Sequence, residues 1–183
     1  MQALISILRG INVSGQKKIL MADLKGLYES LGFTKVTTYI QSGNVVFKAK
    51  EKLSSKALQR EIEKAIQEKY KFAVPVIVRT VDELEHAIFR NPFTKDKNTD
   101  PDKLYVTFLA ENPATTELEN ITNIDYSPDK FIIIDKEVFL EIPGSYGETK
   151  LSNKFFESKL KVSATTRNWK TVNKLFEIAT PLR

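Results

Sequence analysis

The chain has 183 residues, 42% of them hydrophobic and 28% charged, a composition typical of one large globular domain or two small ones. It contains no cysteine, which excludes disulfide bonds, thiol nucleophiles and thiolate metal sites, and it carries a formal net charge of +5. The apolar N-terminal run lacks the basic residues and cleavage site of a signal peptide. No apolar stretch has the length of a membrane span, so we expect a cytoplasmic protein that does not contact a membrane.

Charge is distributed unevenly along the chain. Residues 1–80 carry 14 basic and 6 acidic side chains, residues 81–149 carry 6 and 15, and residues 150–183 carry 8 and 2. One interpretation is that the opposite charges meet within the molecule or between two copies. The other is that the basic segments bind an anion or a nucleic acid. The dispersal of the lysines along the chain favours the first interpretation.

The first half of the chain predicts four strands and three helices. The expected strands are residues 3–8, 36–40, 45–47 and 74–78. Apolar residues at helical spacing predict two helices, with Leu20, Leu24, Leu27 and Leu31 in the first and Leu58, Ile62 and Ile66 in the second. Residues 41–44 have the composition of a hairpin turn, and Pro75 indicates a strand at a sheet edge. Thr80 and Glu83 predict a capping box that opens a third, short helix.

The second half predicts the same order of elements. Residues 91–103 are rich in polar residues and proline, and we expect them to link the two halves. The expected strands are residues 104–109, 131–134, 138–142 and 162–165. Asn112-Pro113 is expected to open the first helix, and Leu151, Phe155 and Leu160 mark the second; a final amphipathic helix carries Trp169, Val172, Leu175, Phe176 and Ala179.

The order strand-helix-strand-strand-helix-strand is that of a ferredoxin-like plait, and here it occurs twice. The sequence therefore predicts an α+β fold made by tandem duplication of ferredoxin-like antiparallel plaits, with domains at residues 1–100 and 101–183. In such a plait the first two strands run in the same direction. Residues that follow these strands should therefore meet at one end of the sheet. This end is expected to gather Arg9, Asn12, Ser14, Gln41, Ser42 and Asn44.

Four stretches carry a family resemblance. They are residues 8–13 (Leu-Arg-Gly-Ile-Asn-Val), 39–47 (Tyr-Ile-Gln-Ser-Gly-Asn-Val-Val-Phe), 91–93 (Asn-Pro-Phe) and 165–169 (Thr-Thr-Arg-Asn-Trp). Together they resemble the bacterial domain-of-unknown-function family 1697 over essentially the whole chain. The resemblance implies two ferredoxin-like repeats and implies no activity. Ser14 departs from the pattern, because a glycine is common at that position.

The glycine-rich segment after the first strand does not match a nucleotide-binding P-loop. A P-loop has Lys directly after its second glycine and then Ser or Thr, whereas Gln16 follows Gly15 and Lys18 follows Lys17. A weaker hypothesis is that backbone N–H groups at the helix start hold an anion with Arg9 as partner. The alternative is a simple turn in which Arg9 pairs with a carboxylate.

The other candidate residues each have a structural alternative. The hairpin 41–44 either presents Gln41 and Ser42 to a ligand or only satisfies a tight turn. Arg167 either binds a phosphate or base beside a helix start, or stands in a segment where Thr166 caps the helix and Trp169 anchors it in the core.

The sequence contains no metal-ligand or cofactor motif, and the single histidine, His86, is expected at the surface. The most concrete functional hypothesis is therefore a binding protein for a small anionic or phosphorylated ligand. The candidate site residues are Arg9, Asn12, Ser14, Gln41, Ser42, Asn44 and Arg167. The alternatives are a nucleic-acid-binding protein and an enzyme of unknown type that uses the same cluster.

Overall fold

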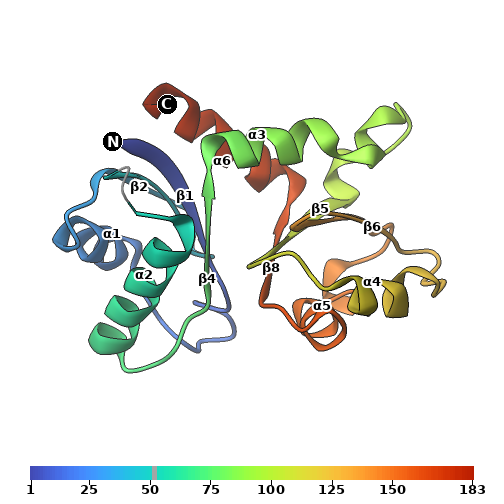
Figure 1. Cartoon of the computed structure of the whole chain (residues 1–183), viewed down its shortest axis with the longest axis horizontal. Helices are drawn as coiled ribbons and strands as arrows, with labels where there is room; N and C mark the ends of the chain where they lie inside the picture. Colours follow the sequence, from blue (N-terminus) through green and yellow to red (C-terminus); the bar gives the residue numbers. More distant parts are fainter. Residues whose placement is uncertain (51–52) are drawn as a thin grey trace. The chain divides into compact units, whose positions relative to one another are not determined.

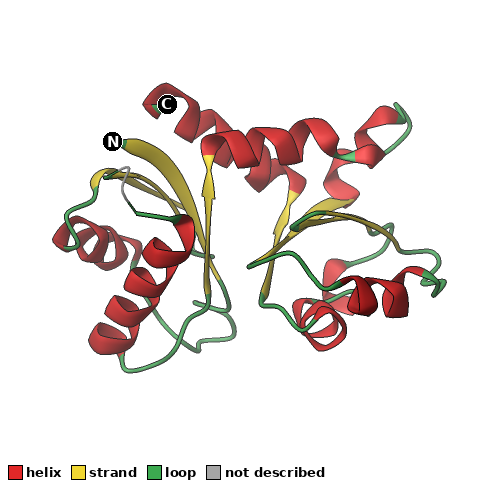
Figure 2. Ribbon diagram, in the orientation of Figure 1, coloured by secondary structure: helices red, strands yellow, loops and turns green. Residues whose placement is uncertain are grey.

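The computed structural model describes residues 1–50 and 53–183, which form two compact units (Figures 1 and 2). The first unit consists of residues 1–86 and 174–183, and the second consists of residues 87–173. Each unit holds one four-stranded antiparallel sheet, which confirms the predicted α+β fold of two ferredoxin-like repeats. The domain boundary expected between residues 100 and 101 stays a prediction.

The first repeat follows the predicted order of elements. It contains β1 (Gln2–Leu8), α1 (Met21–Ser30), β2 (Thr34–Tyr39), β3 (Asn44–Ala49), α2 (Ser55–Tyr70) and β4 (Val76–Thr80), and α3 (Val81–Arg90) comes next. The sheet order is β2-β3-β1-β4, so β4 occupies an edge, as Pro75 indicates. Both β1 and β2 run antiparallel to β3. They therefore run in the same direction, and the segments that follow them emerge at the same end of the sheet.

Helices α1 and α2 lie on one side of the first sheet (Figure 1). The core on this side includes an aromatic cluster in which the Tyr28 ring meets Phe47 edge-on, with ring centroids 5.3 Å apart. The Tyr28 hydroxyl is 2.7 Å from the Ser6 hydroxyl, and both side chains are buried. The opposite face of the sheet is buried as well, since Ile5 and Ile7 are 0% exposed.

The second repeat has matching topology. It contains β5 (Leu104–Leu109), α4 (Thr115–Thr122), β6 (Lys130–Ile134), β7 (Glu137–Glu141), α5 (Asn153–Leu160) and β8 (Ala164–Asn168), and α6 (Trp169–Ala179) comes next. Short 3-10 turns occupy Pro92–Lys95, Pro101–Lys103, Tyr146–Glu148 and Thr180–Leu182. The sheet order is β6-β7-β5-β8, and α4 and α5 pack against one face of the sheet.

Two details of the second repeat differ from expectation. Helix α4 begins at Thr115 with Ala114 as its N-cap, so the prediction that Pro113 opens it is wrong by two residues. Thr166 does not cap α6, because it lies inside β8 and its hydroxyl bonds with Thr107 and Asn153, each at 2.7 Å. Asn168 caps this helix instead, since its Oδ1 accepts the Thr171 N–H at 2.8 Å, and Trp169 is only half-buried.

Both sheets pass directly from their last strand into a helix. No residue separates β4 from α3 or β8 from α6. At the first junction Thr80 N donates to Glu83 Oε2 at 2.8 Å, and Glu83 N donates to Thr80 Oγ1 at 3.1 Å. The predicted capping box is therefore confirmed.

The hairpin between β2 and β3 fits closely against the segment after β1. Gly43 has φ of +82°, and its carbonyl oxygen accepts the Leu8 N–H at 2.8 Å. A Cβ at Gly43 would lie 2.6 Å from Ile11 Cδ1 and 2.8 Å from Leu8 Cβ. Glycine is therefore required here both for its backbone conformation and for its lack of a side chain.

The Gly43→Ala variant is expected to lose about 2–4 kcal/mol of unfolding free energy, because left-handed strain and overpacking add. The matched control is Gly26→Ala in α1, where an added Cβ meets nothing within 4 Å. This control is expected to gain roughly 0.5–1 kcal/mol from helix propensity. Urea denaturation of both variants checks this prediction, and equal stabilities would contradict it.

Tyr28 makes stability depend on pH in the alkaline range. Burial raises the pKa of Tyr28 above its ordinary value, so only the unfolded tyrosine ionises just above pH about 10. The wild type is therefore expected to lose up to about 1.4 kcal/mol of stability per pH unit above that pH, relative to Tyr28→Phe. Below that pH, Tyr28→Phe itself costs about 1 kcal/mol, since it removes the Tyr28–Ser6 hydrogen bond and leaves the Ser6 hydroxyl only the Val45 carbonyl, 3.5 Å away. The measurement is the unfolding free energy of both proteins at a series of pH values from 8 to 12. If the difference between the two proteins stays constant over this range, the raised pKa of Tyr28 is refuted.

Candidate functional site

Three segments of the first unit meet where β1 ends. They are residues 9–20, 40–43 and 71–75, and we call them together the basic end of the first sheet. The Arg9 N–H donates to the Pro75 carbonyl at 3.0 Å, and Lys17 Nζ donates to the Ala73 carbonyl at 2.7 Å. These bonds attach segment 9–20 to the residues that precede β4, which pairs with β1.

Asn12 joins the first two segments. Its Nδ2 donates to the Ile19 carbonyl at 2.9 Å and to the Gln41 carbonyl at 2.8 Å, and its Oδ1 accepts the Ile19 N–H at 2.9 Å. The expectation that the loop after β1 lies beside the hairpin is therefore confirmed for Asn12 and Gln41. The same bonds commit the Asn12 amide to holding the backbone in place.

Asn44 also holds backbone in place. It is 0% exposed, and its Nδ2 donates to the Tyr39 carbonyl at 3.0 Å and to Ser42 Oγ at 3.1 Å. The amide thus fastens both sides of the hairpin turn. By contrast, Ser14 and Gln41 are exposed at the surface, and Arg9 and Ser42 are half-buried.

The backbone of the basic end is unusually rich in left-handed conformations. Positive φ angles occur at Gly10, Asn12, Ser14, Gly15, Lys17, Ile40, Gly43 and Lys71. Ser14 has φ of 49°, a conformation that favours glycine and explains why glycine suits this position. Ile40, at φ of 50°, is β-branched and 47% exposed, which is uncommon on both counts. Such conformations cost free energy and gather at functional sites.

The charged side chains of the three segments are all positive, and the Glu63 carboxylate of α2 lies just beyond them, where it accepts the Val76 N–H at 2.9 Å. Residues 9–20, 40–43 and 71–75 contain Arg9, Lys17, Lys18 and Lys71 and no aspartate or glutamate. Sequence reasoning missed Lys71 as part of this group. The signal was present in the topology, because β4 runs antiparallel to β1 and must bring the residues before it to this end.

Arg167 belongs to the second unit. Its Nη1 donates to the Thr166 carbonyl at 2.9 Å, and burial lowers the pKa of the guanidinium to about 10, an effect that the nearby Tyr146 opposes. The side chain remains protonated at neutral pH.

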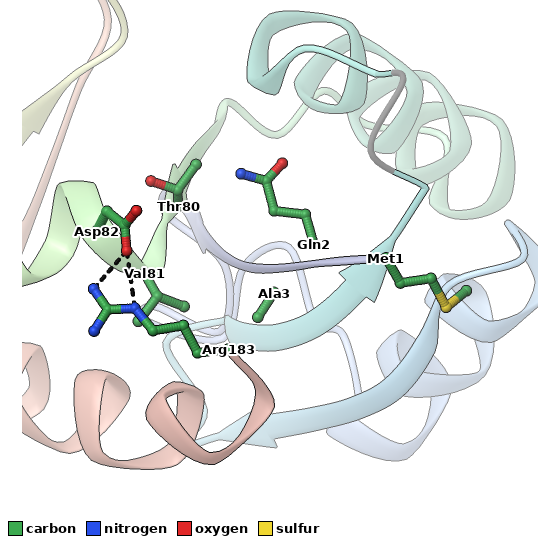
Figure 3. Close-up of a pocket in the computed structure, with 7 residues that line it drawn as sticks. All are labelled: Met1, Gln2, Ala3, Thr80, Val81, Asp82 and Arg183. Atoms are coloured by element: carbon green, nitrogen blue, oxygen red, sulfur yellow. Dashed lines mark hydrogen bonds and ion pairs between the residues drawn. The ribbon is translucent and has the colours of Figure 1, made fainter.

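A cavity of about 460 Å³ lies elsewhere in the first unit (Figure 3). Figure 3 shows the Arg183 guanidinium turned toward Asp82, with Nε 2.9 Å from Oδ1, and Arg183 also pairs with Glu85. The hydrogen bond from Arg183 lowers the pKa of the Glu85 carboxyl. The charges of Asp82 and Arg183 that line this cavity thus compensate each other, and the remaining lining is neutral side chains and Met1.

Other candidate chemistry is sparse. His86 is exposed in α3, which confirms its expected surface position. Within residues 1–50 and 53–183, no group of three or more His, Asp or Glu side chains is arranged to hold a metal ion. In the same described ranges, no helix combines the length and the apolar character needed to cross a membrane.

Comparisons with known proteins agree with the family resemblance. A family model described as "Protein of unknown function (DUF1697)" matches residues 1–139. A solved structure, "The structure of conserved bacterial protein SP0830 from Streptococcus pneumoniae", is similar with a TM-score of 0.75 and 23% identity, covering 97% of this chain and 98% of that chain. At that identity the likeness shows the fold alone, and no curated protein matches. The chain belongs to the DUF1697 family of proteins of unknown function.

Proposed function

We propose that the basic end of the first sheet binds a small phosphorylated ligand. The observation that carries this proposal is the presence of Arg9, Lys17, Lys18 and Lys71 on two adjoining segments, 9–20 and 71–75, that contain no carboxylate. A guanidinium binds phosphate through two parallel hydrogen bonds, and ammonium groups add positive charge around it. The group would favour a phosphate over a neutral ligand of the same size.

The start of α1 supports the same chemistry. The helix begins at Met21, and its N-cap residue Leu20 makes no side-chain hydrogen bond to the first turn. Backbone N–H groups at such a start are donors without helical partners, and the helix dipole adds partial positive charge. Asp23 in the first turn offsets part of this charge. The four cations therefore remain the main attraction for an anion.

The predicted site residues divide into two roles under this proposal. Arg9, Ser14 and Gln41 contact the ligand, through a guanidinium, a hydroxyl and an amide. Asn12 and Asn44 position the loop and the hairpin, since their amides already bond to backbone. Ser42 supports Asn44 through their 3.1 Å hydrogen bond. Arg167 belongs to the second unit and is not among the residues proposed to contact this ligand.

Nucleic acid is the second candidate ligand. Ferredoxin-like plaits that bind single strands present aromatic side chains on the open sheet face. In this chain that face of the first sheet carries Ile5, Ile7 and Val46, which are each 0% exposed. Contact with a nucleic acid would be limited to phosphates at the basic end, and such binding weakens steeply as salt rises.

A thermal-shift assay tests the proposal on the full chain. The probes are ATP, glucose 6-phosphate, citrate and a short oligothymidylate, each at 25 and 150 mM salt. A phosphorylated probe at about a hundred times its Kd is expected to stabilise the protein by about 2.7 kcal/mol, or roughly 5–10 °C. The Arg9→Ala variant and the Lys18→Gln/Lys71→Gln double variant are expected to lose this shift while keeping the wild-type circular dichroism spectrum.

The matched control removes two lysines from the helices of the same unit. Lys25 and Lys64 are exposed and pair with Glu29 and Glu68, so Lys25→Gln/Lys64→Gln should keep the full shift. If only the oligothymidylate stabilises the protein, and only at low salt, the ligand is a nucleic acid. If citrate acts as strongly as the phosphates, the end binds anions without selecting phosphate. If no probe raises the melting temperature, the proposal fails.

A further inference from the structure

Strand β6 is the outer strand of the second sheet, and among the residues that the structure describes it pairs only with β7. Its five residues keep one register, from Lys130 opposite Glu141 to Ile134 opposite Glu137. A two-residue turn makes Ile134 and Glu137 a hydrogen-bonded pair, and hydrogen-bonded pairs alternate along an antiparallel ladder. The N–H and C=O groups of Phe131 and Ile133 therefore point to the open side of the sheet.

The equivalent strand of the first sheet, β2, is protected by a bulge, whereas β6 has an unbroken register. In β2 the register shifts between Thr34 and Thr37, and Lys35 has φ of 53°, so the edge carries a bulge and a charge. Bulges and charges of this kind discourage pairing with another strand. Strand β6 has the sequence Lys-Phe-Ile-Ile-Ile with no shift in register, and Ile132 is 41% exposed.

Two adjoining cavities lie beside β6. One, of about 380 Å³, is lined by residues 130–133 of β6 and by the segment that follows α4. The other, of about 420 Å³, shares residues 124–127 and 129 with it and reaches Glu148. The strand edge thus opens onto a hollow whose lining includes the exposed side chains of Ile124 and Ile132.

The hollow is acidic. Asp125, Asp129 and Glu148 line it, and hydrogen bonds from Ser127 lower the pKa of the Asp125 carboxyl, which is ionised at neutral pH. The Lys130 ammonium is already paired with Glu141 at 2.8 Å, which leaves Lys150 as the other cation of the lining. The surrounding residues 111–148 contain nine acidic and two basic side chains.

We propose that the open edge of β6 binds an extended peptide with alternating basic and apolar side chains, which adds a fifth strand to the second sheet. Main-chain groups of Phe131 and Ile133 would bond the peptide backbone, as in other cases of strand addition. The carboxylates of Asp125, Asp129 and Glu148 select its basic side chains, and Ile124 and Ile132 contact its apolar ones. A second copy of the chain is disfavoured as occupant, because pairing β6 with β6 would bring two acidic sets together. This surface lies in the second unit and is independent of the basic end of the first sheet.

The test uses the full chain and a fluorescent peptide of about nine residues that alternates lysine and valine. Binding is followed by anisotropy at 150 mM salt, and amide hydrogen exchange locates the peptide. The expected result is saturable binding that slows exchange at Phe131 and Ile133 by about tenfold or more and leaves β2 unchanged. The same peptide N-methylated at alternate residues should not bind, because it lacks the backbone donors.

A pair of double variants tests the charge selection. Asp125→Asn/Glu148→Gln is expected to weaken binding about tenfold. The control Glu117→Gln/Glu119→Gln removes the same charge from α4, outside the hollow, and is expected to change binding less than about twofold. Equal binding of the N-methylated peptide, no binding of either peptide, or no protection at Phe131 and Ile133 would each overturn the proposal. A dimer in sedimentation that protects these same amides would overturn it in favour of a second copy.

Discussion

The side-chain amide of Asn12 is the contact on which the end of the first sheet depends. One side chain bonds both the N–H and the C=O of Ile19, and it also reaches the Gln41 carbonyl in the hairpin. The loop is thereby closed on itself just before α1 and attached to a neighbouring turn. A buried or half-buried amide that satisfies three backbone groups is costly to replace, because each orphaned group loses its partner. The side chain thus holds Gln41 in place, while the Asn12 backbone N–H donates to the Lys17 carbonyl at 3.2 Å.

The two repeats share a topology, but different residues form the polar hydrogen bonds of their central strands. Behind the first sheet, Ser6 meets Tyr28 from α1; behind the second, Thr107 meets Thr166, which in turn bonds to Asn153 at the start of α5. Each is a buried or partly buried set of hydrogen bonds that joins the central strand, β1 or β5, to a neighbouring helix or strand. Polar links of this kind have to be fully satisfied, so they specify one packing arrangement more sharply than apolar contacts do. The repeats differ in charge as well, since the first is basic, whereas the second combines an acidic stretch at residues 111–148 with a basic one at residues 150–168.

Much of the fold followed from the sequence because local signals agreed with one another. Leucine spacing in α1, the Thr80–Glu83 capping box and the β-branched runs each indicated one kind of element, and the order of elements indicated the plait. The helix starts were predicted less well, because several neighbouring residues can each begin a helix. Before α6, both Thr166 and Asn168 are suitable caps, and only tertiary contacts with Thr107 and Asn153 decide that Thr166 belongs to a strand. Before α4, Pro113 is equally suitable, but the helix begins two residues later. The juxtaposition of Asn12 with Gln41 was predictable from strand directions. That Asn12 and Asn44 bond backbone was not, because an amide of the same sequence could equally well face solvent.

Strand β4 continues into helix α3 without a connecting residue, so the side-chain repeat of the strand and that of the helix are in a fixed relation. A strand repeats every two residues and a helix every 3.6, so a change of one residue in chain length turns a strand side chain to the opposite face and rotates a helix face by about 100°. In a chain with a loop at such a junction, an insertion is absorbed there. Here an inserted residue would have to displace either Arg79, which is 2% exposed, or Val81 and Leu84, which are buried on the helix. The length of residues 76–90 is therefore fixed by geometry, and variation in chain length has to be accommodated in the loops instead.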